Sequence, residues 1–216
     1  MTRITVLGGT GYVGSNIVAE AAKRGLVVVS LSRTAPESPI TGVDYQLGSV
    51  QHDDALQHAI EGADVVVSAL SPRGELAGNN ILRSVEKKIA KLTMVEGARL
   101  GVVGGAGSLR TAEGGPMLHE GSEFPEAVKP EAIEMAGVLD DLNANTSGID
   151  WFYVSPAAEF GSHNPGEATG VYRVGGDVVL TDAEGKSFIS GADLALAVVD
   201  EILHPKHSCT RFTVAY

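Results

Sequence analysis

A glycine-rich segment near the start of the chain constrains its fold more than any other feature. Residues 8–14 have the pattern G-x-x-G-x-x-G and follow the apolar run 4–7. Residues 12–24 then carry apolar side chains at helical spacing, and residues 26–31 are almost uninterruptedly apolar, as in a strand covered on both faces. The pattern predicts a strand, a tight glycine turn, a helix and a second strand.

The alternation of strand and helix patterns continues along the chain. Further strands are expected at 43–47, 64–69, 100–103, 151–154 and 211–215, and further helices at 53–60, 80–91, 131–143 and 193–203. Residues 171–180, with Gly-Gly-Asp in the middle, are expected to form a hairpin. Together these elements predict an α/β fold with a doubly wound, mostly parallel sheet.

Two long segments rich in glycine and proline follow expected strands. Loops of this length are usually functional, and ligands of open α/β sheets bind beyond the carboxyl ends of the strands. No linker or repeat divides the sequence. We therefore expect one domain, residues 1–216, with loops 104–125 and 156–190 on the substrate side.

The chemistry of the glycine pattern points to a dinucleotide. Gly8 and Gly11 would permit a tight turn and let the backbone approach a pyrophosphate, while Gly14 would let the helix pack closely on the strand. The helix N-terminus would add free N–H groups and a partial positive charge. The chain is therefore expected to be an NAD(P)-binding Rossmann domain.

The residues after the second strand distinguish NADP from NAD. An acidic side chain there accepts hydrogen bonds from the adenosine ribose, whereas an arginine accommodates the 2′-phosphate. Here the position is occupied by Ser32 and Arg33, and no Asp or Glu lies between Glu20 and Glu37. A guanidinium group matches phosphate geometry, so we predict NADP(H) in preference to NAD(H).

Composition excludes several classes of protein. The net charge of −11 disfavours nucleic-acid binding, which depends on many Lys and Arg side chains. No apolar run reaches the roughly 20 residues of a membrane span, and the first residues lack a signal-peptide pattern, so we expect no membrane association and a cytoplasmic location. Cys209 is the only cysteine and has too few neighbouring ligands for a metal site, even with His204 and His207.

Five segments distributed over the whole chain carry a family resemblance. They are residues 8–14, 65–70 (VVVSAL), 102–109 (VVGGAGSL), 155–160 (SPAAEF) and 211–216 (RFTVAY). With these segments the chain resembles atypical short-chain dehydrogenases/reductases, in the NAD(P)H-binding group that includes proteins provisionally named NADH-flavin reductases. It is similar also to biliverdin-IX-beta reductase/flavin reductase and to NmrA-like proteins.

The resemblance implies a place along the cofactor for each matching residue. Residues 10–13 would contact the pyrophosphate, and Ser49 and Val50 the adenine, although relatives commonly carry Asp where Ser49 stands. Ala69 and Leu70 would lie by the ribose. The full set of expected cofactor-binding residues is Gly8, Thr10, Gly11, Tyr12, Val13, Gly14, Ser32, Arg33, Ser49, Val50, Ala69, Leu70, and, at the nicotinamide end, Gly104, Gly105 and Pro156.

The usual catalytic pair of short-chain dehydrogenases is missing. None of the five tyrosines is followed four residues later by Lys, so the Tyr-x-x-x-Lys route to alcohol–carbonyl chemistry is not expected. Ser108 is the candidate catalytic residue, with capping of the loop backbone as its alternative. His119 and Lys129 are weaker candidates.

Reduction of a flavin or a quinone makes smaller demands on the protein. The conjugated ring accepts hydride and can take its proton from water, so positioning of the nicotinamide could suffice. We therefore predict an NAD(P)H-dependent reductase of a small planar acceptor. The alternative is an NmrA-like sensor that binds the dinucleotide without turnover, and a nucleotide-sugar epimerase is disfavoured by the missing Tyr-x-x-x-Lys. The oligomeric state is left open.

Overall fold

Eight strands form one sheet in the order β3-β2-β1-β4-β5-β6-β8-β7. The computed structural model describes residues 1–216. The strands are β1 (Arg3–Leu7), β2 (Val27–Ser32), β3 (Asp44–Leu47), β4 (Val65–Ser68), β5 (Arg99–Val103), β6 (Trp151–Ser155), β7 (Arg173–Gly175) and β8 (Thr210–Ala215). All neighbouring strands are parallel except β7 and β8.

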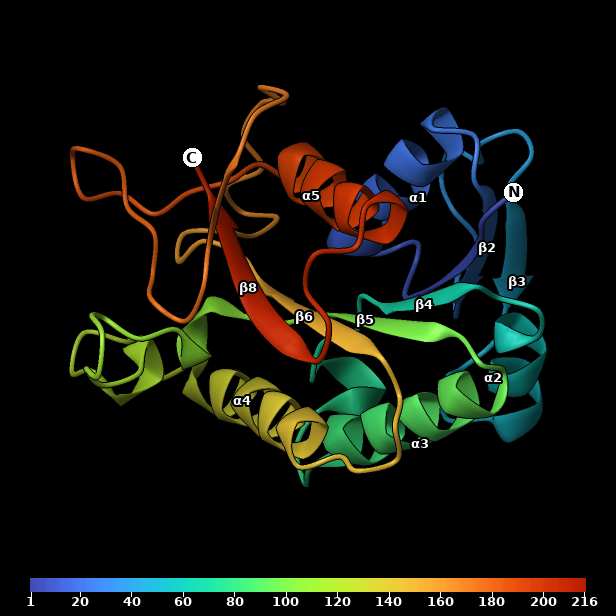
Figure 1. Ribbon diagram of the computed structural model, residues 1–216, viewed down its shortest axis with the longest axis horizontal. Helices are drawn as coiled ribbons and strands as arrows, with labels where there is room; N and C mark the ends of the chain where they lie inside the picture. The colour runs from blue at the N-terminus through green and yellow to red at the C-terminus, as the bar shows by residue number, and fades with distance from the viewer.

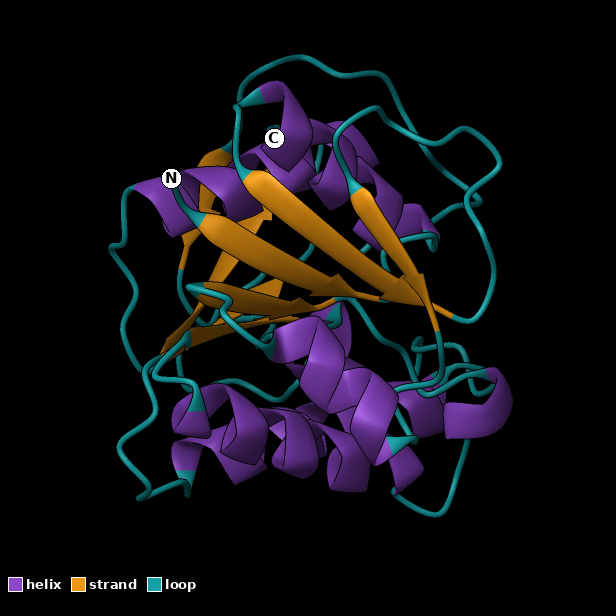
Figure 2. Cartoon of the chain, turned by 90° about the vertical axis from the view of Figure 1, so that its right-hand side faces the viewer, coloured by secondary structure: helices purple, strands orange, loops and turns teal.

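Helices cover both faces of this sheet, as Figures 1 and 2 show. They are α1 (Tyr12–Lys23), α2 (Asp53–Ile60), α3 (Ile81–Val95), α4 (Lys129–Asn143) and α5 (Gly191–Leu203), with short 3-10 turns η1 (Gly74–Leu76), η2 (Ala106–Ser108) and η3 (Leu118–Glu120). α1 and α5 pack together on one face, and α2, α3 and α4 lie on the other. No helix has the length and apolar character needed to cross a membrane.

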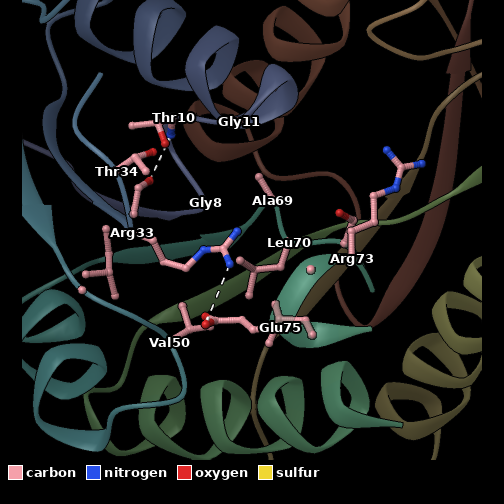
Figure 3. Close-up of a pocket in the computed structure, with 16 residues that line it drawn as sticks. Gly8, Thr10, Gly11, Arg33, Thr34, Val50, Ala69, Leu70, Arg73 and Glu75 are labelled. Atoms are coloured by element: carbon pink, nitrogen blue, oxygen red, sulfur yellow. Dashed lines mark hydrogen bonds and ion pairs between the residues drawn. The ribbon is translucent and has the colours of Figure 1, made fainter. Parts of the chain in front are cut away.

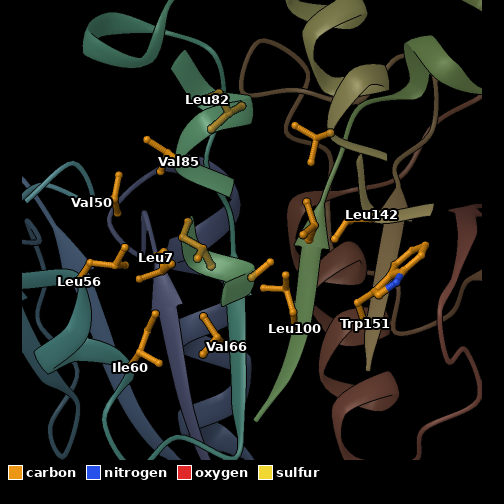
Figure 4. Packing of buried hydrophobic residues seen from close by; sticks show 14 of the residues in the cluster. Leu7, Val50, Leu56, Ile60, Val66, Leu82, Val85, Leu100, Leu142 and Trp151 are labelled. Atoms are coloured by element: carbon orange, nitrogen blue, oxygen red, sulfur yellow. The ribbon is translucent and has the colours of Figure 1, made fainter. Parts of the chain in front are cut away.

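The core is divided by the sheet into two clusters of buried side chains. Strand β4 shows why, because Val66 faces the cluster beneath α2, α3 and α4 while Val65 and Val67 face the cluster beneath α1 and α5. Figure 4 shows Val66 with Leu7, Leu100 and other members of the first cluster. Alternate side chains of a strand point to opposite faces, so a strand buried on both sides reads as a continuous apolar run.

The predicted doubly wound α/β Rossmann fold is confirmed, with one local error. Residues 171–180 do not form a hairpin: β7 pairs with β8 instead, Val174 lying opposite Val214. The residues that follow β7 bond to Arg110, whose N–H donates to the Asp177 carbonyl (2.8 Å) and whose own carbonyl accepts from Val179 (2.9 Å). Both partners are distant in sequence, so the local Gly-Gly-Asp pattern was misleading.

The remaining boundaries differ from the expected ones by a few residues. The largest difference is in α3, which runs to Val95 instead of ending at residue 91. It ends only where Gly97 adopts a φ of 71°, a conformation that glycine tolerates and that terminates many helices.

The position of β1 in the sheet determines where the site lies. This strand lies between β2 and β4, so the chain goes to one side of it through α1 and later returns to its other side at β4. Loops that follow neighbouring strands therefore diverge at the carboxyl edge and leave a crevice there, which is where ligands bind in such sheets.

Candidate functional site

The glycine turn has the tight geometry that its sequence predicts. The N–H of Gly8 donates to the Leu31 carbonyl (2.9 Å), the N–H of Gly11 donates to the Gly8 carbonyl (3.0 Å), and Gly8 has a φ of 81°. A Cβ on Gly14 would lie 2.7 Å from Cα of Gly9, so α1 could not approach the turn with a larger residue there. The backbone thus forms a cradle at the N-terminus of α1, as a bound pyrophosphate requires.

A cleft runs across the carboxyl edge of the sheet from this turn. Its first part, here called the β2-side pocket, has a volume of about 340 Å³ and lies between the turns after β1, β2 and β4 (Figure 3). The second part, the β5-side pocket, has a volume of about 620 Å³ and lies beyond β5 and β6. The two pockets share Gly11, Ala69, Leu70, Ser71 and Arg73, so they form one continuous cleft.

Nearly all the residues expected at the cofactor line this cleft. The two exceptions are Gly14, which packs beneath the turn, and Ser49, whose hydroxyl donates to Oε1 of Glu75 (2.7 Å). Ser32 supports the turn directly, because its Oγ accepts the N–H of Thr10 (3.0 Å). Residues from the six turns and loops that follow β1 to β6 are thus brought to a single edge of the sheet.

Arg33 extends into the β2-side pocket. Its side chain is 59% exposed, and its Nη1 lies 3.8 Å from Oε2 of Glu75 on the opposite wall (Figure 3). Arg73 lines the same pocket and is paired through Nε with Glu131 (2.8 Å). The sequence analysis did not predict Glu75 and Arg73. Both are charged residues that follow β4, at the same edge of the sheet as the glycine turn, and this position could have indicated that they line the site.

The β5-side pocket has a glycine floor and largely apolar walls. The floor includes Gly104 and Gly105, and a Cβ on Gly105 would meet nothing nearer than the Gly107 nitrogen at 4.0 Å. The ring of Tyr153 lies directly beneath Gly104, its hydroxyl donating to the Met135 carbonyl (3.1 Å). The walls come from the loop before α4, from α4 itself and from the loop after β6: Phe124, Pro125, Val128, Ala132, Met135, Phe160, Gly161 and His163.

The three candidate catalytic residues lie outside the residues that line this cleft. Ser108 is buried, and its Oγ accepts from Nη1 of Arg211 (2.9 Å). His119 Nδ1 lies 2.9 Å from the Gly107 carbonyl, and Lys129 is paired with Glu126 (3.1 Å). Catalysis by Ser108 stays a prediction, one that requires its hydroxyl to leave Arg211. The hydroxyl forms no hydrogen bond with the loop backbone, as the capping alternative would require; Arg211 instead donates to the Ser108 carbonyl as well (2.9 Å).

A buried carboxyl group contacts the end of β4, next to the residues shared by the two pockets. Glu86 on α3 accepts a hydrogen bond at Oε1 from the Ser68 hydroxyl (2.5 Å), and its Oε2 has no partner. Burial raises the pKa of Glu86 to about 7, with the Ser68 hydrogen bond acting in the opposite direction. Ser68 ends β4 immediately before Ala69, so the pair fixes the strand end that carries the shared wall of the two pockets.

The titration of Glu86 predicts a loss of stability on going from acid to neutral pH. The pKa of Glu86 is about 7 in the folded protein, against an ordinary value of 4.5. Between these two pH values Glu86 is therefore protonated in the folded protein and ionised in the unfolded chain. Stability therefore falls as pH rises through this window, by as much as about 3 kcal/mol. Urea unfolding at pH 5 and pH 8 should show this fall in the wild type and not in Glu86→Gln; equal pH dependence of the two proteins would contradict it.

Comparison with known proteins identifies relatives over the full length. A curated but uncharacterized protein of Bacillus subtilis, YwnB, is 38% identical over 98% of this chain and 97% of its own. A Bacteroides thetaiotaomicron structure provisionally assigned as an epimerase is 34% identical (TM-score 0.88; 100% of this chain, 97% of that chain). A Streptococcus pneumoniae structure provisionally assigned as an NADH-flavin reductase is 30% identical (TM-score 0.83; 100% and 99%).

The family assignment agrees with the geometry of the site. The sequence profile of a family described as NAD(P)H-binding matches residues 8–205, which begin at the glycine turn and include both pockets of the cleft. A nicotinamide dinucleotide is the cofactor that this family binds, and the cradle at the turn suits its pyrophosphate. The chain therefore belongs to the NAD(P)H-binding family, among oxidoreductase-like proteins of the atypical short-chain dehydrogenase/reductase type.

Proposed function

We propose that this protein is an NAD(P)H-dependent reductase that transfers hydride, preferably from NADPH, to a small planar acceptor such as a flavin or a quinone. The observation that carries the proposal is the continuous cleft, which joins a glycine turn suited to pyrophosphate to an apolar pocket large enough for a ring system. The flavin-reductase assignment of the similar Streptococcus pneumoniae structure supports the acceptor class.

The chain's own groups would hold the dinucleotide extended along the cleft. Backbone N–H groups at the start of α1 face the pyrophosphate position, Arg33 the 2′-phosphate position, and Ala69 and Leu70 the riboses between the pockets. The reduced nicotinamide supplies the hydride when it is bound. Because even a Cβ on Gly105 would meet nothing nearer than the Gly107 nitrogen at 4.0 Å, the glycine floor leaves room for that ring to lie flat.

The β5-side pocket would hold the acceptor against this floor. Phe124 and Phe160 belong to the two long loops and give the pocket apolar walls that favour a flat conjugated ring and exclude bulk water. On this basis we assign loops 104–125 and 156–190 to the substrate side of one domain, residues 1–216. A reduced flavin or quinone can take its proton from water, so the proposal needs no side-chain acid in the pocket.

Turnover can be tested by the loss of reduced-nicotinamide absorbance. We expect oxidation of NADPH to depend on added FMN, riboflavin or a simple quinone, to saturate with the acceptor, and to be slower with NADH at equal concentration. Tight binding of the dinucleotide without turnover would contradict the reductase proposal and support the NmrA-like sensor. Absence of binding would contradict both.

The preference for NADPH is tested separately by Arg33→Gln. Loss of the guanidinium should weaken NADPH binding by about tenfold or more, because hydrogen bonds to charged groups are worth about 1.5–3 kcal/mol, and should change NADH binding by much less. Lys23→Gln is a matched control, since it removes one positive charge from an exposed side chain at the far end of α1. Equal weakening of both cofactors in Arg33→Gln would contradict the assignment of Arg33.

A further inference from the structure

Glu75 places a carboxylate inside the β2-side pocket, opposite the arginine that favours a phosphate. It belongs to η1, which follows β4, whereas Arg33 follows β2. Oε1 accepts a hydrogen bond from Ser49 (2.7 Å), and Oε2 faces Nη1 of Arg33 at 3.8 Å. The two side chains point toward each other across the pocket (Figure 3).

The two charges favour opposite forms of the adenosine ribose. A carboxylate accepts hydrogen bonds from the 2′-hydroxyl of NADH, whereas a guanidinium pairs with the 2′-phosphate of NADPH. In many dinucleotide sites the carboxylate comes from the end of the second strand, a position held here by Ser32 and Arg33. The fold nevertheless supplies a carboxylate to the same pocket, from the opposite wall.

The ion pair between these groups is loose enough to be replaced. The side chain of Arg33 is 59% exposed and that of Glu75 is 37% exposed, and 3.8 Å is long for a direct contact. Exposed pairs of this kind contribute little to stability, so a ligand group can compete for either partner. Glu75 is held independently by Ser49, and its backbone carbonyl also accepts a hydrogen bond from the Gln51 side chain (3.2 Å). The carboxylate is therefore held in the pocket even when Arg33 turns to another anion.

We propose that Glu75 determines the cofactor preference of this site, accepting the ribose 2′-hydroxyl of NADH and opposing the 2′-phosphate of NADPH. The inference rests on the proposed function, because it places the adenosine in the β2-side pocket. The inference goes beyond the proposed function because it assigns a role in cofactor specificity to a residue outside the glycine motif and outside the turn after β2. The Arg33–Glu75 pair then lets one pocket accept both cofactors, with NADPH only moderately preferred.

The test is the change of cofactor preference in Glu75→Gln. Glutamine keeps the size of the side chain and an oxygen that accepts from Ser49, but it loses the charge. By calorimetric titration of the purified protein, NADPH should bind about fivefold more tightly and NADH about fivefold more weakly, so the ratio of dissociation constants changes by about 25-fold. Glu61→Gln is the matched control, since it removes one negative charge from a carboxylate that is 74% exposed and outside both pockets.

Separate outcomes identify which statement fails. If the wild type binds NADPH and NADH but Glu75→Gln leaves the ratio of their dissociation constants unchanged, the role of Glu75 is overturned while the proposed function stands. The same holds if Glu61→Gln changes the ratio as much as Glu75→Gln does, because the effect is then one of net charge. If the wild type binds neither cofactor, the proposed function is overturned and this inference with it.

Discussion

Replacing Gly104 with alanine is expected to lower the free energy of unfolding by about 3 kcal/mol, whereas the same change at Gly105 should leave it nearly unchanged. A Cβ on Gly104 would overlap the ring of Tyr153, which is fully buried and held by its hydrogen bond to Met135. A Cβ on Gly105 would meet only the Gly107 nitrogen, at 4.0 Å. Two adjacent glycines of one strand–loop junction thus have different structural requirements.

A larger side chain at Gly105 should instead abolish cofactor use. Gly105→Val would project its methyl groups from the floor of the β5-side pocket. We expect a loss of NADPH turnover of about 100-fold or more, since misplacement by about 1 Å can cost that much, with the free energy of unfolding retained. Urea unfolding and the absorbance assay, run on the same preparations, measure the two effects. A Gly105→Val protein that turns over normally would exclude the nicotinamide from this floor.

Removal of Glu201 is expected to destabilise the protein by about 3 kcal/mol, because it leaves the buried guanidinium of Arg99 with only the half-exposed Asp150 (Nε–Oδ2 3.0 Å) as a carboxylate partner. Arg99 Nη2 lies 2.7 Å from Oε1 of Glu201, and both side chains are at most 10% exposed. Glu201 also accepts from the ring of His207 (2.7 Å) and from the backbone N–H of Lys206 (3.0 Å). This cluster joins the amino end of β5 to the end of α5, remote from the cleft.

The same cluster gives the protein a sensitivity to acid. Burial alone would raise the pKa of Glu201, but the hydrogen bonds from Arg99 and His207 outweigh it and hold the pKa below its ordinary value. The stability that this carboxylate contributes is therefore complete above the ordinary pKa and is lost as pH falls through the lowered one. Between pH 7 and pH 3.5, the free energy of unfolding of Glu201→Ala should fall by less than that of the wild type. A destabilisation below about 1 kcal/mol at pH 7 would contradict the role of the pair.

A matched double variant separates the buried charge from the packing. Arg99→Met combined with Glu201→Met removes both charges and keeps apolar volume, so it should recover much of the stability that Glu201→Ala loses. No recovery would mean that the hydrogen bonds of Glu201 with the backbone, or those of Arg99 with Asp150 and His207, carry the effect rather than the loss of the partner charge.

Elements whose signals are local could be predicted from the sequence. The glycine turn, α1 and β2 follow from spacing and apolar pattern within residues 4–31, and the structure confirms the unit. β7 was missed because its partner, β8, lies far along the chain and no local pattern encodes that pairing. The prediction followed the nearby Gly-Gly-Asp, which is a turn signal without a specified partner.

The sequence predicted the glycine positions of the site better than the orientation of its side chains. Gly8 was found because a close approach of main chains at the turn requires glycine, whereas Gly104 was found only through the family resemblance. The orientation of Ser108 was not found, since it depends on Arg211 from the last strand, and Glu75 was not found because its position depends on the packing of η1 against the turn after β3. Side chains that meet across a cleft are set by tertiary structure, and a motif search cannot locate them.

The position of β8 has a consequence for the order of folding. β8 lies between β6 and β7 and is the hydrogen-bonded neighbour of both, although it follows them in the chain. During synthesis, β1 to β6 can therefore assemble with α1 to α4 while one edge of β6 is still unpaired. Unpaired strand edges promote aggregation, and pairings distant in sequence form slowly. Late docking of β8 is thus the step at which a nascent chain is most exposed to misassembly.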